Sequence, residues 1–335
     1  MDIGILTGGG DAAGLNPAIK WFVAALDIMD DGHNVIGIKD GWRGLEVGDP
    51  KLLTRNFERF RDNDKVHFLT LTSSLVRPWD RDGGTHLGSS RTNPCQDLKN
   101  SDGTVTRPAS LRIEDVLKRF RALGLDTLVA IGGEDTLGVA ARLSKDHGIR
   151  VVGIPKTIDL DIPKEATDYS LGFETALAGN TECINKLRTT AGSHSRILVV
   201  ETMGRKAGHL ALQTGIVNGA EVIVIPEHPF DITRIASILK EYRRARKHRY
   251  GIVVVAEGSR DKKGLYALAS KEVDQFGHPK LGGVGQFIAN GLDAILGKDS
   301  TRYMQLGHLQ RGGPPVVYDR LMGQKFGFAA AHLVL

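Results

Sequence analysis

Residues 127–154 read TLVAIGGEDTLGVAARLSKDHGIRVVGI. The stretch opens with a short apolar run at 127–131, which is interrupted by Gly132-Gly133. Residues 137–143 then have helical periodicity, and residues 151–154 are apolar again. A strand, a turn, a helix and a second strand in this order predict a βαβ unit, whose two strands lie parallel in one sheet.

The same alternation continues in both directions along the chain. Further apolar, strand-like runs occur at residues 3–6, 35–38, 197–200, 222–225 and 252–255, and helix-like segments at Leu15–Met29, 113–123, 174–186 and Ile232–Arg246. This rhythm predicts an α/β protein with doubly wound, mostly parallel sheets and helices on both faces. A length of 335 residues suggests two domains.

Composition and charge restrict the class of protein. The chain is 41% hydrophobic and 25% charged, as is usual for soluble globular proteins, and it contains only two cysteines, Cys95 and Cys183, which lack zinc-ligand spacing. We find no signal-peptide pattern and no apolar run that could span a bilayer, so we expect a cytoplasmic protein. The net charge of +5 is modest, and the basic cluster at 243–249 has no interleaved aromatic residues, so nucleic acid is not an expected partner.

Polar, glycine-rich turns follow five of the predicted strands. They are Gly8-Gly9-Gly10-Asp11, Gly132-Gly133-Glu134-Asp135-Thr136, the segment 155–161, Thr202-Met203-Gly204-Arg205, and Glu257-Gly258. Ligands of doubly wound proteins bind at the carboxyl ends of the strands. The five turns therefore predict one ligand site.

The residue types in these turns suit phosphoryl chemistry. Two of the turns place successive glycines before a helix, which frees backbone N–H groups for an anion. Four carboxylates, those of Glu134, Asp135, Asp159 and Asp161, suggest Mg²⁺ and a base for a hydroxyl group, and Lys156 adds a cation. The chain has no GxxxxGK[ST] motif, and its first turn misses the GxGxxG register, which disfavours a dinucleotide-dependent oxidoreductase.

Two further features are typical of a site for a phosphorylated substrate. Arginines lie at or near predicted strand ends in the second half, at Arg196, Arg205, Arg302 and Arg311, and His308 precedes Arg311 by three residues. Guanidinium groups bind phosphate in a bidentate manner. Residues 73–106 have no clear periodicity, and an excursion of this length is often functional.

Seven motifs together resemble the phosphofructokinase family. They are Leu6-Thr7-Gly8-Gly9-Gly10-Asp11, Gly84-Thr85-His86-Leu87-Gly88-Ser89-Ser90-Arg91, Gly132-Gly133-Glu134-Asp135, Pro155-Lys156-Thr157-Ile158-Asp159, Met203-Gly204-Arg205, Ala256-Glu257-Gly258 and Gly307-His308-Leu309-Gln310-Arg311-Gly312-Gly313. They occur in the family's order and cover nearly the whole chain. The resemblance implies an active site between two domains and phosphoryl transfer to the 1-hydroxyl of fructose 6-phosphate.

The resemblance also implies a role for each matching residue. Asp159 would be the base, assisted by Thr157, Lys156 and Arg205, and Glu134 and Asp161 would hold Mg²⁺, with Glu134 in place of the usual Asp. The donor would be bound by Gly10, Arg91, Gly133, Asp135, Thr136 and Lys156. The sugar phosphate would be bound by Thr157, Ile158, Asp159, Met203, Gly204, Arg205, Glu257, His308 and Arg311. Arg196 and Arg302 match positions that reach a neighbouring subunit's site, which implies a homodimer or homotetramer.

Two positions bear on the phosphoryl donor, since family members use ATP or pyrophosphate. ATP users generally have Gly where this chain has Asp135, whose side chain would occupy the space of the nucleotide's α-phosphate. Its charge would add a repulsion of about 1 kcal/mol at 4 Å even in water. Lys156 stands where many ATP users have Gly, and its ammonium could stabilise a pyrophosphate leaving group. Pyrophosphate is therefore the expected donor, which would make the reaction readily reversible.

We expect residues 1–170 to form a donor-binding domain and residues 171–300 a sugar-phosphate-binding domain. Residues 301–335 would be a strand and a helix packing between the two, in a chain that is short at its C-terminus for this family. Leu160 replaces the Asn common between Asp159 and Asp161, which could lower activity. The alternatives are an ATP-dependent 6-phosphofructokinase and a catalytically weak, sugar-phosphate-binding regulatory subunit; the intact Asp159, Arg205 and Arg311 argue against the latter.

Overall fold

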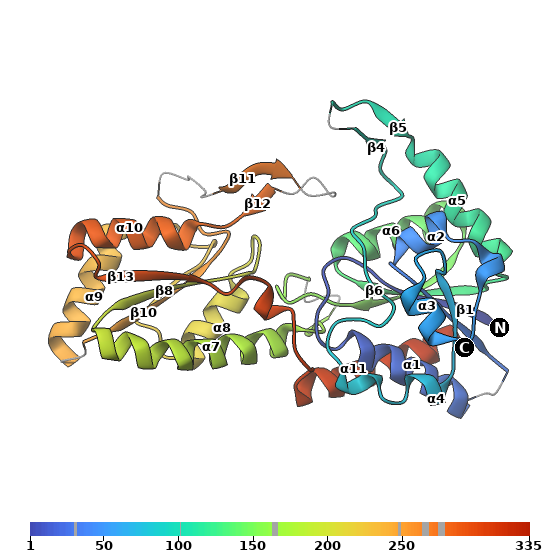
Figure 1. The fold of residues 1–335 in the computed structure, drawn as a ribbon, viewed down its shortest axis with the longest axis horizontal. Helices are drawn as coiled ribbons and strands as arrows, with labels where there is room; N and C mark the ends of the chain where they lie inside the picture. Colours follow the sequence, from blue (N-terminus) through green and yellow to red (C-terminus); the bar gives the residue numbers. More distant parts are fainter. Residues whose placement is uncertain (30–31, 101, 163–166, 247–248, 263–267, 274–278) are drawn as a thin grey trace. The chain divides into compact units, whose positions relative to one another are not determined.

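The computed structural model describes residues 1–29, 32–100, 102–162, 167–246, 249–262, 268–273 and 279–335. The chain forms two compact units (Figure 1). Unit 1 comprises Met1–Thr157, Ile162–Gly172 and Gly313–Leu335, and unit 2 comprises Ile158–Asp161 and Phe173–Gly312. Residues 301–335, which the sequence suggested as one connecting segment, are thus divided, with 301–312 in unit 2 and the rest in unit 1.

Unit 1 is built on a five-stranded sheet of order β3-β2-β1-β6-β7. Its strands are β1 (Asp2–Thr7), β2 (Asn34–Ile38), β3 (Phe68–Leu71), β6 (Thr127–Gly132) and β7 (Arg150–Pro155). All neighbours are parallel except β2 and β3, which are antiparallel. The sequence prediction missed β3, a four-residue edge strand too short to show alternation. The chain order reverses between β1 and β6, so the switch point of this sheet lies between the turns that follow these two strands.

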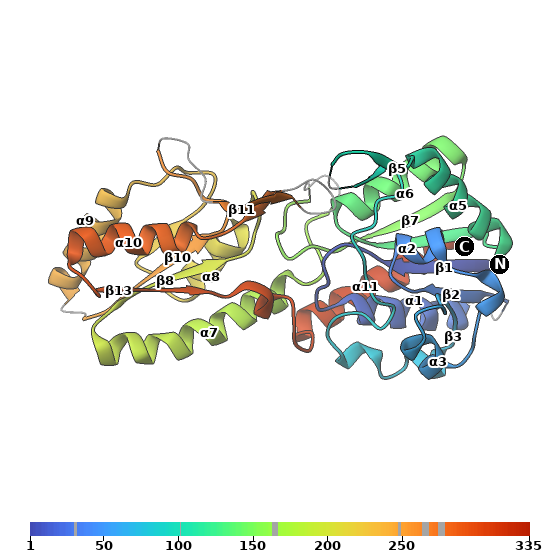
Figure 2. The ribbon, with the colours of Figure 1, turned by 45° about the horizontal axis from the view of Figure 1, so that its top comes forward.

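Helices cover both faces of this sheet, because its side chains alternate between two cores (Figure 2). Ile3, Ile5, Val129 and Ile131 pack with helix α1 (Leu15–Met29) and helix α11 (Val317–Val334). Leu128 and Ala130 on the other face pack with α2 (Trp42–Val47), α5 (Ala109–Ala122) and α6 (Glu134–His147). Two short helices, α3 (Phe57–Asp62) and α4 (Ser73–Val76), complete the unit's α-helices among the described residues.

Helix α11 packs closely along α1, and glycines make this approach feasible. A Cβ at Gly327 would lie 2.7 Å from the backbone nitrogen of Phe22 and 2.8 Å from the carbonyl oxygen of Ala18. A Cβ at Gly323 would lie 2.6 Å from the Cβ of Pro17. The last helix of the chain therefore belongs to the core of unit 1, beside the first helix.

Unit 2 is built on a four-stranded parallel sheet of order β13-β8-β10-β9. Its strands are β8 (Ile197–Thr202), β9 (Val222–Val224), β10 (Gly251–Ala256) and β13 (Thr301–Gln305). Alternate residues of β8 and β10 pack with α9 (Ile232–Arg246) and α10 (Val284–Leu296) on one face, and with α7 (Phe173–His194) and α8 (His209–Val217) on the other. The predicted fold class is confirmed, and Leu15–Met29 and Ile232–Arg246 have the bounds expected from sequence.

The remaining elements are short. In the described ranges, 3-10 turns lie at Pro50–Leu52 (η1), Trp79–Arg81 (η2) and Gly307–Gln310 (η3). Strands β4 (Leu98–Lys99) and β5 (Val105–Arg107) pair antiparallel, as do β11 (Leu268–Val273) and β12 (Pro279–Leu281). Among its described residues, the aperiodic excursion 73–106 contains α4, η2, β4 and the start of β5. Residues 247–248 of the predicted basic cluster lie outside the described residues.

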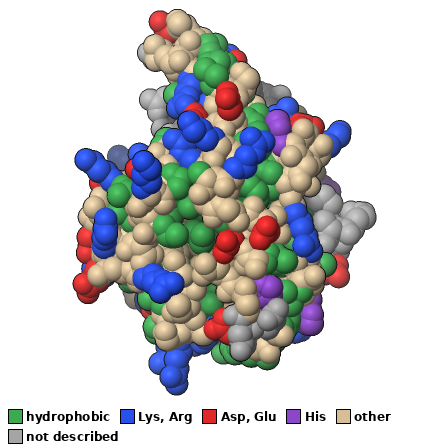
Figure 3. Space-filling model, turned by 90° about the vertical axis from the view of Figure 1, so that its right-hand side faces the viewer, with side chains coloured by type: hydrophobic (Ala, Val, Ile, Leu, Met, Phe, Trp, Pro, Cys, Tyr) green, Lys and Arg blue, Asp and Glu red, His purple; other side chains and the backbone are tan. Residues whose placement is uncertain are grey.

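The surface of unit 1 mixes charges of both signs. The face shown in Figure 3 carries scattered Lys and Arg side chains among acidic and apolar ones. None of the helices in the described ranges has the length and apolar character required to cross a membrane.

Candidate active site

Two glycine turns of unit 1 meet at the carboxyl ends of β1 and β6, on either side of the switch point. The backbone nitrogen of Gly8 donates to the carbonyl of Ile131 (2.9 Å), and that of Lys156 donates to the carbonyl of Gly132 (3.0 Å). Thr136 of α6 packs under both turns: its Oγ1 would lie 2.6 Å from a Cβ on Gly8, and its Cβ 2.5 Å from one on Gly132. A Cβ at either position would collide with Thr136, so glycine lets both turns pack directly on the start of α6.

The ammonium of Lys156 lies against the first glycine turn. It donates a hydrogen bond to the carbonyl oxygen of Gly10, and a Cβ on Gly9 would lie 3.6 Å from its Nζ. The residue is only 4% exposed. A buried ammonium at this turn supplies a fixed positive charge for a phosphate group.

The loop that carries Arg91 is joined to the same turn. The backbone nitrogen of Gly9 donates to the carbonyl of Ser90 (3.0 Å), and the Ser89 hydroxyl donates to the carbonyl of Gly9 (2.6 Å). Thr7 Oγ1 also donates to the carbonyl of Gly88 (2.7 Å). The sequence motif that ends at Arg91 is thus brought to the glycine turn from more than 70 residues away.

Asn16 holds the start of that loop, and the sequence analysis did not identify it. Its side-chain nitrogen donates to the carbonyls of Asp82 (3.1 Å) and Gly83 (3.2 Å), and its Oδ1 accepts from the backbone nitrogen of His86 (2.9 Å). The residue is fully buried at the start of α1. The sequence did contain a signal for this role, because Asn16 places an amide at a position where the helix otherwise buries apolar side chains.

At the first turn of α6, Glu134 and Asp135 follow Gly133, which is the N-cap residue. Carboxylates are stabilised at a helix N-terminus. Glu134 is exposed and Asp135 is partly exposed, so both can face a ligand.

The segment that follows Lys156 is tied back to unit 1 at both of its ends. The Ser170 hydroxyl donates to the carbonyl of Thr157 (2.7 Å), and the backbone nitrogen of Leu171 donates to the carbonyl of Pro155 (3.3 Å). The buried carboxylate of Asp319 on α11 accepts from the Tyr169 hydroxyl (2.6 Å) and the backbone nitrogen of Gly172 (2.7 Å), both at Oδ1. Asp319 is a second residue that sequence reasoning missed.

Residues 158–161 belong to unit 2, where Asp159 is 6% exposed. Leu160 has φ = 52°, in the left-handed region that disfavours branched side chains and tolerates Asn. The departure noted in the sequence therefore places a strained residue between Asp159 and the exposed Asp161.

The Met203-Gly204-Arg205 and Glu257-Gly258 motifs meet at the carboxyl ends of β8 and β10. Glu257 Oε1 accepts from the backbone nitrogen of Arg205 (3.1 Å), and a Cβ on Gly258 would collide with the carbonyl of Arg205. Arg205 has φ = 50°, and strain of this kind is typical of functional turns. Burial, with added repulsion from the Asp159 and Glu201 carboxylates, raises the pKa of Glu257 to about 7.

The His308–Arg311 motif joins the same edge of unit 2 through Gln310. The side chain of this buried residue accepts from the backbone nitrogen of Met203 (3.2 Å) and donates to the carbonyl of Gly307 (3.0 Å). Gln310 was part of a recognised motif but was given no role. The predicted sugar-phosphate residues Met203, Gly204, Arg205, Glu257, His308 and Arg311 therefore lie on neighbouring turns.

Arg196 and Arg302 lie elsewhere in unit 2. Arg196 directly precedes β8, and Arg302 pairs with Leu198 near the start of that strand. A six-residue strand separates this end from Met203 by about 20 Å. Within one chain, these two arginines are not part of the cluster at the carboxyl edge.

The predicted magnesium ligands fall in different units, Glu134 in unit 1 and Asp161 in unit 2. Within the described part of the chain, no group of three or more His, Cys, Asp or Glu side chains is arranged to hold a metal ion.

Comparisons with known proteins agree with these motifs. The family model for phosphofructokinase matches residues 2–334. The chain is 43% identical over 334 residues to a pyrophosphate–fructose 6-phosphate 1-phosphotransferase of Streptomyces coelicolor and 44% identical over 334 residues to one of Amycolatopsis methanolica, covering all of this chain and 87% of each relative. It is 40% identical over 334 residues to ATP-dependent 6-phosphofructokinase 3 of Streptomyces coelicolor, again with 100% and 87% coverage.

Solved structures have the same fold. A phosphofructokinase from Saccharomyces cerevisiae superposes with a TM-score of 0.75 at 26% identity, covering 99% of this chain and 41% of that one. A pyrophosphate-dependent phosphofructokinase from Nitrosospira multiformis gives a TM-score of 0.75 at 20% identity, covering 99% and 76% of the two chains. From its motifs, its fold and its match over nearly every residue, the chain belongs to the phosphofructokinase family.

Proposed function

We propose that this protein transfers a phosphoryl group from pyrophosphate to the 1-hydroxyl of fructose 6-phosphate, giving fructose 1,6-bisphosphate and phosphate. The observation that carries the choice of donor is Asp135 in the first turn of α6, next to a glycine turn against which Lys156 is buried. Four relatives at 43–44% identity that bear the pyrophosphate-dependent name support the same choice.

On the donor side, the bare backbone of Gly10 and Gly133 receives the pyrophosphate oxygens, with Thr136 supporting the turns from below. Lys156 and Arg91 supply positive charge. Asp135 excludes a nucleotide, because its carboxylate would lie where an α-phosphate has to pass. Pyrophosphate has no further phosphate or nucleoside to accommodate.

On the sugar side, Met203, Gly204, Arg205, Glu257, His308 and Arg311 bind fructose 6-phosphate, together with Thr157, Ile158 and Asp159. The guanidinium of Arg311 suits the 6-phosphate. Glu257, protonated at or below about pH 7, can donate as well as accept a hydrogen bond with sugar hydroxyls.

The chemical step requires one proton transfer and one displacement. Asp159 accepts the proton of the 1-hydroxyl, while the hydroxyl oxygen forms a bond to the near phosphorus of pyrophosphate. The bond from that phosphorus to the bridging oxygen breaks, and its electron pair leaves with inorganic phosphate. Lys156 offsets the charge that develops on the leaving phosphate, and Arg205 offsets the charge on the group in transfer. The phosphoryl donor and the sugar phosphate product differ little in phosphoryl-transfer potential, so the reaction is reversible.

The carboxylates fit Mg²⁺, which binds proteins through one or two of them and completes its shell with substrate phosphate and water. Glu134 and Asp161 are the residues that would hold it, and both are exposed. Mg²⁺ would neutralise charge on the donor's phosphate oxygens. The reach of Glu134, one methylene longer than Asp, permits ligation through a water molecule.

At the level of the molecule, unit 1 binds the donor and unit 2 the sugar phosphate. Arg196 and Arg302, remote from the carboxyl edge of their own sheet, act in the site of a neighbouring subunit in a homodimer or homotetramer. The protein works in the cytoplasm.

ATP as donor is the second candidate, because relatives with the ATP-dependent name are 40% identical to this chain. The distinguishing experiment measures fructose 1,6-bisphosphate formed from fructose 6-phosphate and Mg²⁺, with either pyrophosphate or ATP. We expect a higher kcat/KM with pyrophosphate. A preference for ATP would refute the proposed donor, and turnover with neither would support a regulatory subunit.

A further inference from the structure

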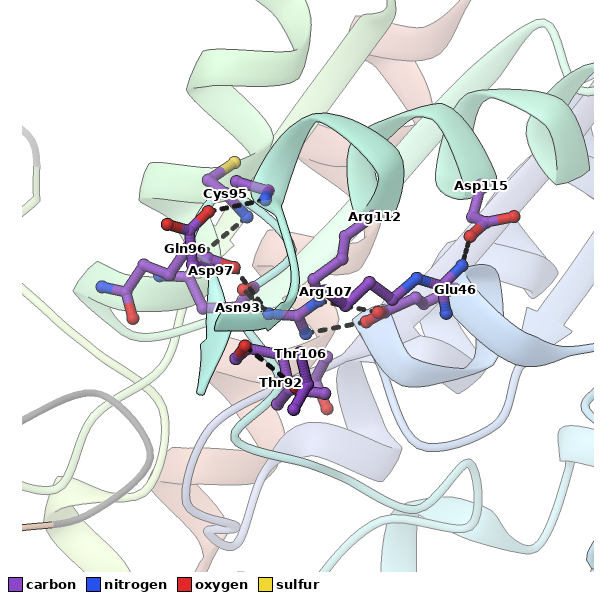
Figure 4. A network of polar contacts seen from close by, with 12 residues as sticks. Glu46, Thr92, Asn93, Cys95, Gln96, Asp97, Thr106, Arg107, Arg112 and Asp115 are labelled. Carbon is purple, nitrogen blue, oxygen red and sulfur yellow. Dashed lines mark hydrogen bonds and ion pairs between the residues drawn. The ribbon is translucent and has the colours of Figure 1, made fainter. Parts of the chain in front are cut away.

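A buried ion pair in unit 1 lies beside the segment 92–97, which directly follows Arg91 in the chain (Figure 4). Arg112 on α5 and Glu46 on α2 each have side chains 7% exposed. Arg112 donates through Nε to Glu46 Oε1 (2.7 Å) and through Nη2 to Oε2 (2.8 Å), which is a bidentate pair. This pairing fixes the orientation of the guanidinium and leaves its third nitrogen, Nη1, available for other acceptors.

That nitrogen, Nη1, binds the chain just after Arg91. It donates to the carbonyls of Asn93 (2.8 Å) and Gln96 (2.7 Å). The turn between these two residues is closed by its own bonds, from the backbone nitrogen of Gln96 to the carbonyl of Asn93 (3.3 Å) and from that of Cys95 to Asn93 Oδ1 (3.0 Å). Arg112 therefore fastens a small rigid turn to α5.

On its other side, Arg91 follows a residue that is fastened to the glycine turn. The carbonyl of Ser90 accepts from the backbone nitrogen of Gly9, and its hydroxyl donates to the carbonyl of Asp40 (2.7 Å). The backbone of Arg91 is thus held between two anchors, one before it at Ser90 and one starting two residues after it at Asn93. The first anchor belongs to the donor turn, and the second depends on Arg112.

The two carbonyl bonds distinguish Arg112 from a residue that only joins α5 to α2. Arg119 lies seven residues further along α5, two turns on and on the same face. It joins the helices by donating through Nε to the carbonyl of Gly48 (2.6 Å), just after α2, and it contacts Asp115. It has no hydrogen bond to the 92–97 segment among those described, so it is a matched control.

We propose that Arg112 is a positioning residue for Arg91 and thereby sets the affinity for the phosphoryl donor; the identity of that donor rests on the function proposed above. Arg112→Lys keeps a charge opposite Glu46 but cannot span both the carboxylate and the two carbonyls. Arg119→Lys perturbs the same helix pair and leaves the turn attached.

Cys95 provides a readout that needs no substrate. Cys95 is half-buried and lines a cavity of about 40 Å³ with Ile113 and Arg142, and burial raises the pKa of its thiol, which slows its reaction with a reagent. The chain has two cysteines, so a Cys183→Ser background leaves Cys95 as the single thiol. Reaction with an aromatic disulfide such as DTNB then reports release of the turn.

In this background we expect Arg112→Lys to raise the labelling rate of Cys95 by about tenfold. We also expect it to raise the KM for pyrophosphate by about tenfold, with the KM for fructose 6-phosphate unchanged. Arg119→Lys should leave both quantities near those of the parent, and Arg91→Ala should raise only the KM for pyrophosphate. Should Arg112→Lys fail to fold, Glu46→Gln tests the same anchor, with smaller changes in the same directions.

Equal labelling rates in Arg112→Lys and its parent would overturn the inference, as would equal changes in Arg112→Lys and Arg119→Lys. A rise in both KM values together would mean that the ion pair only stabilises the fold, and would also overturn it. Absence of turnover with pyrophosphate in the parent would refute the proposed function instead, and the labelling comparison would still decide the positioning role.

Discussion

At the scale of single residues, the donor specificity proposed here depends on the volume and charge of the Asp135 side chain. Asp135, which the family resemblance aligns with a glycine of ATP users, lies at a helix N-terminus that stabilises its charge. The substitution needs no change in the fold around it, because a carboxylate in the first turn of a helix is favourable. The proposed role of Asp135 implies that donor choice changes at one position while the glycine turns remain the same.

We predict that Asp135→Gly gives measurable ATP-dependent activity, because it removes both the steric block and a repulsion of about 1 kcal/mol or more. The kcat/KM for ATP should rise by about tenfold, and that for pyrophosphate should change less. Steady-state assays with each donor test this. The control is Asp135→Asn, which removes the charge but keeps the volume; if it restores ATP use equally, the block is electrostatic alone.

Glu257 gives a prediction about pH. Its pKa in the native protein is about 7, mainly because it is buried, whereas the unfolded carboxyl titrates near 4.5. Between these values the native state binds more protons than the unfolded state, so this group's contribution to the free energy of unfolding falls as pH rises from about 4.5 to 7. The loss is on the order of 2–3 kcal/mol.

Glu257→Gln should remove this dependence. The free energy of unfolding of the wild type relative to that of the variant should decrease between pH 5 and pH 8, as measured by urea denaturation. Glu241→Gln, on an exposed part of α9, is the control and should show no such trend. A difference that is constant with pH would contradict the assignment.

At the scale of elements, the chain joins distant segments through buried polar side chains. Asp319 of α11 accepts two hydrogen bonds from the 169–172 segment, which in turn is bound to Pro155 and Thr157. The last helix therefore supports the turn that leads into Asp159. In unit 2, the side chain of Gln310 supports a turn in the same way, by accepting a hydrogen bond from the backbone nitrogen of Met203.

We predict that Asp319→Ala lowers the free energy of unfolding of unit 1 by about 2–4 kcal/mol, because it leaves two buried donors without an acceptor. It should also lower kcat more than it changes either KM, since it loosens the segment beside Thr157. Tyr169→Phe removes one of the two bonds and should cost about 1 kcal/mol. Urea denaturation and steady-state kinetics measure both effects; a loss no larger for Asp319→Ala than for Tyr169→Phe would argue against this support.

At the scale of the whole molecule, the unfolding of unit 1 can be measured separately from that of unit 2. All three tryptophans, Trp21, Trp42 and Trp79, lie in unit 1, so their fluorescence reports the unfolding of that unit. Unit 1 is closed by packing the last helix on the first. Its stability therefore depends on glycines that the sequence alone does not distinguish from other helical glycines.

Two glycine substitutions should act in opposite directions. Gly327→Ala places a Cβ 2.7 Å from the backbone of Phe22 and should destabilise unit 1 by about 2 kcal/mol. Gly138→Ala, in helix α6 with nothing within 4 Å of its Cβ, should stabilise it by about 0.5–1 kcal/mol. Thermal unfolding followed by tryptophan fluorescence tests the pair, and effects of the same sign would contradict the packing of α11 on α1.

Local sequence patterns were sufficient to predict most of the strands, helices and turns of this molecule. Apolar runs and helical periodicity located seven strands and the main helices, because burial on one face leaves a periodic trace in the sequence. The turns at strand ends, with Gly8, Gly132 and Gly204, were visible because glycine marks places where a side chain would collide.

The remainder depended on contacts between residues far apart in the chain, which leave no periodic trace. The pairing of β3 with β2, the return of α11 to unit 1, and the bonds of Asn16, Asp319 and Gln310 are of this kind. So is the Arg112–Glu46 pair, which spans 66 positions. The types and order of the residues were sufficient to predict the chemistry of the turns. The polar contacts that hold those turns in place form only in the folded core, where each buried polar group requires a hydrogen-bond partner.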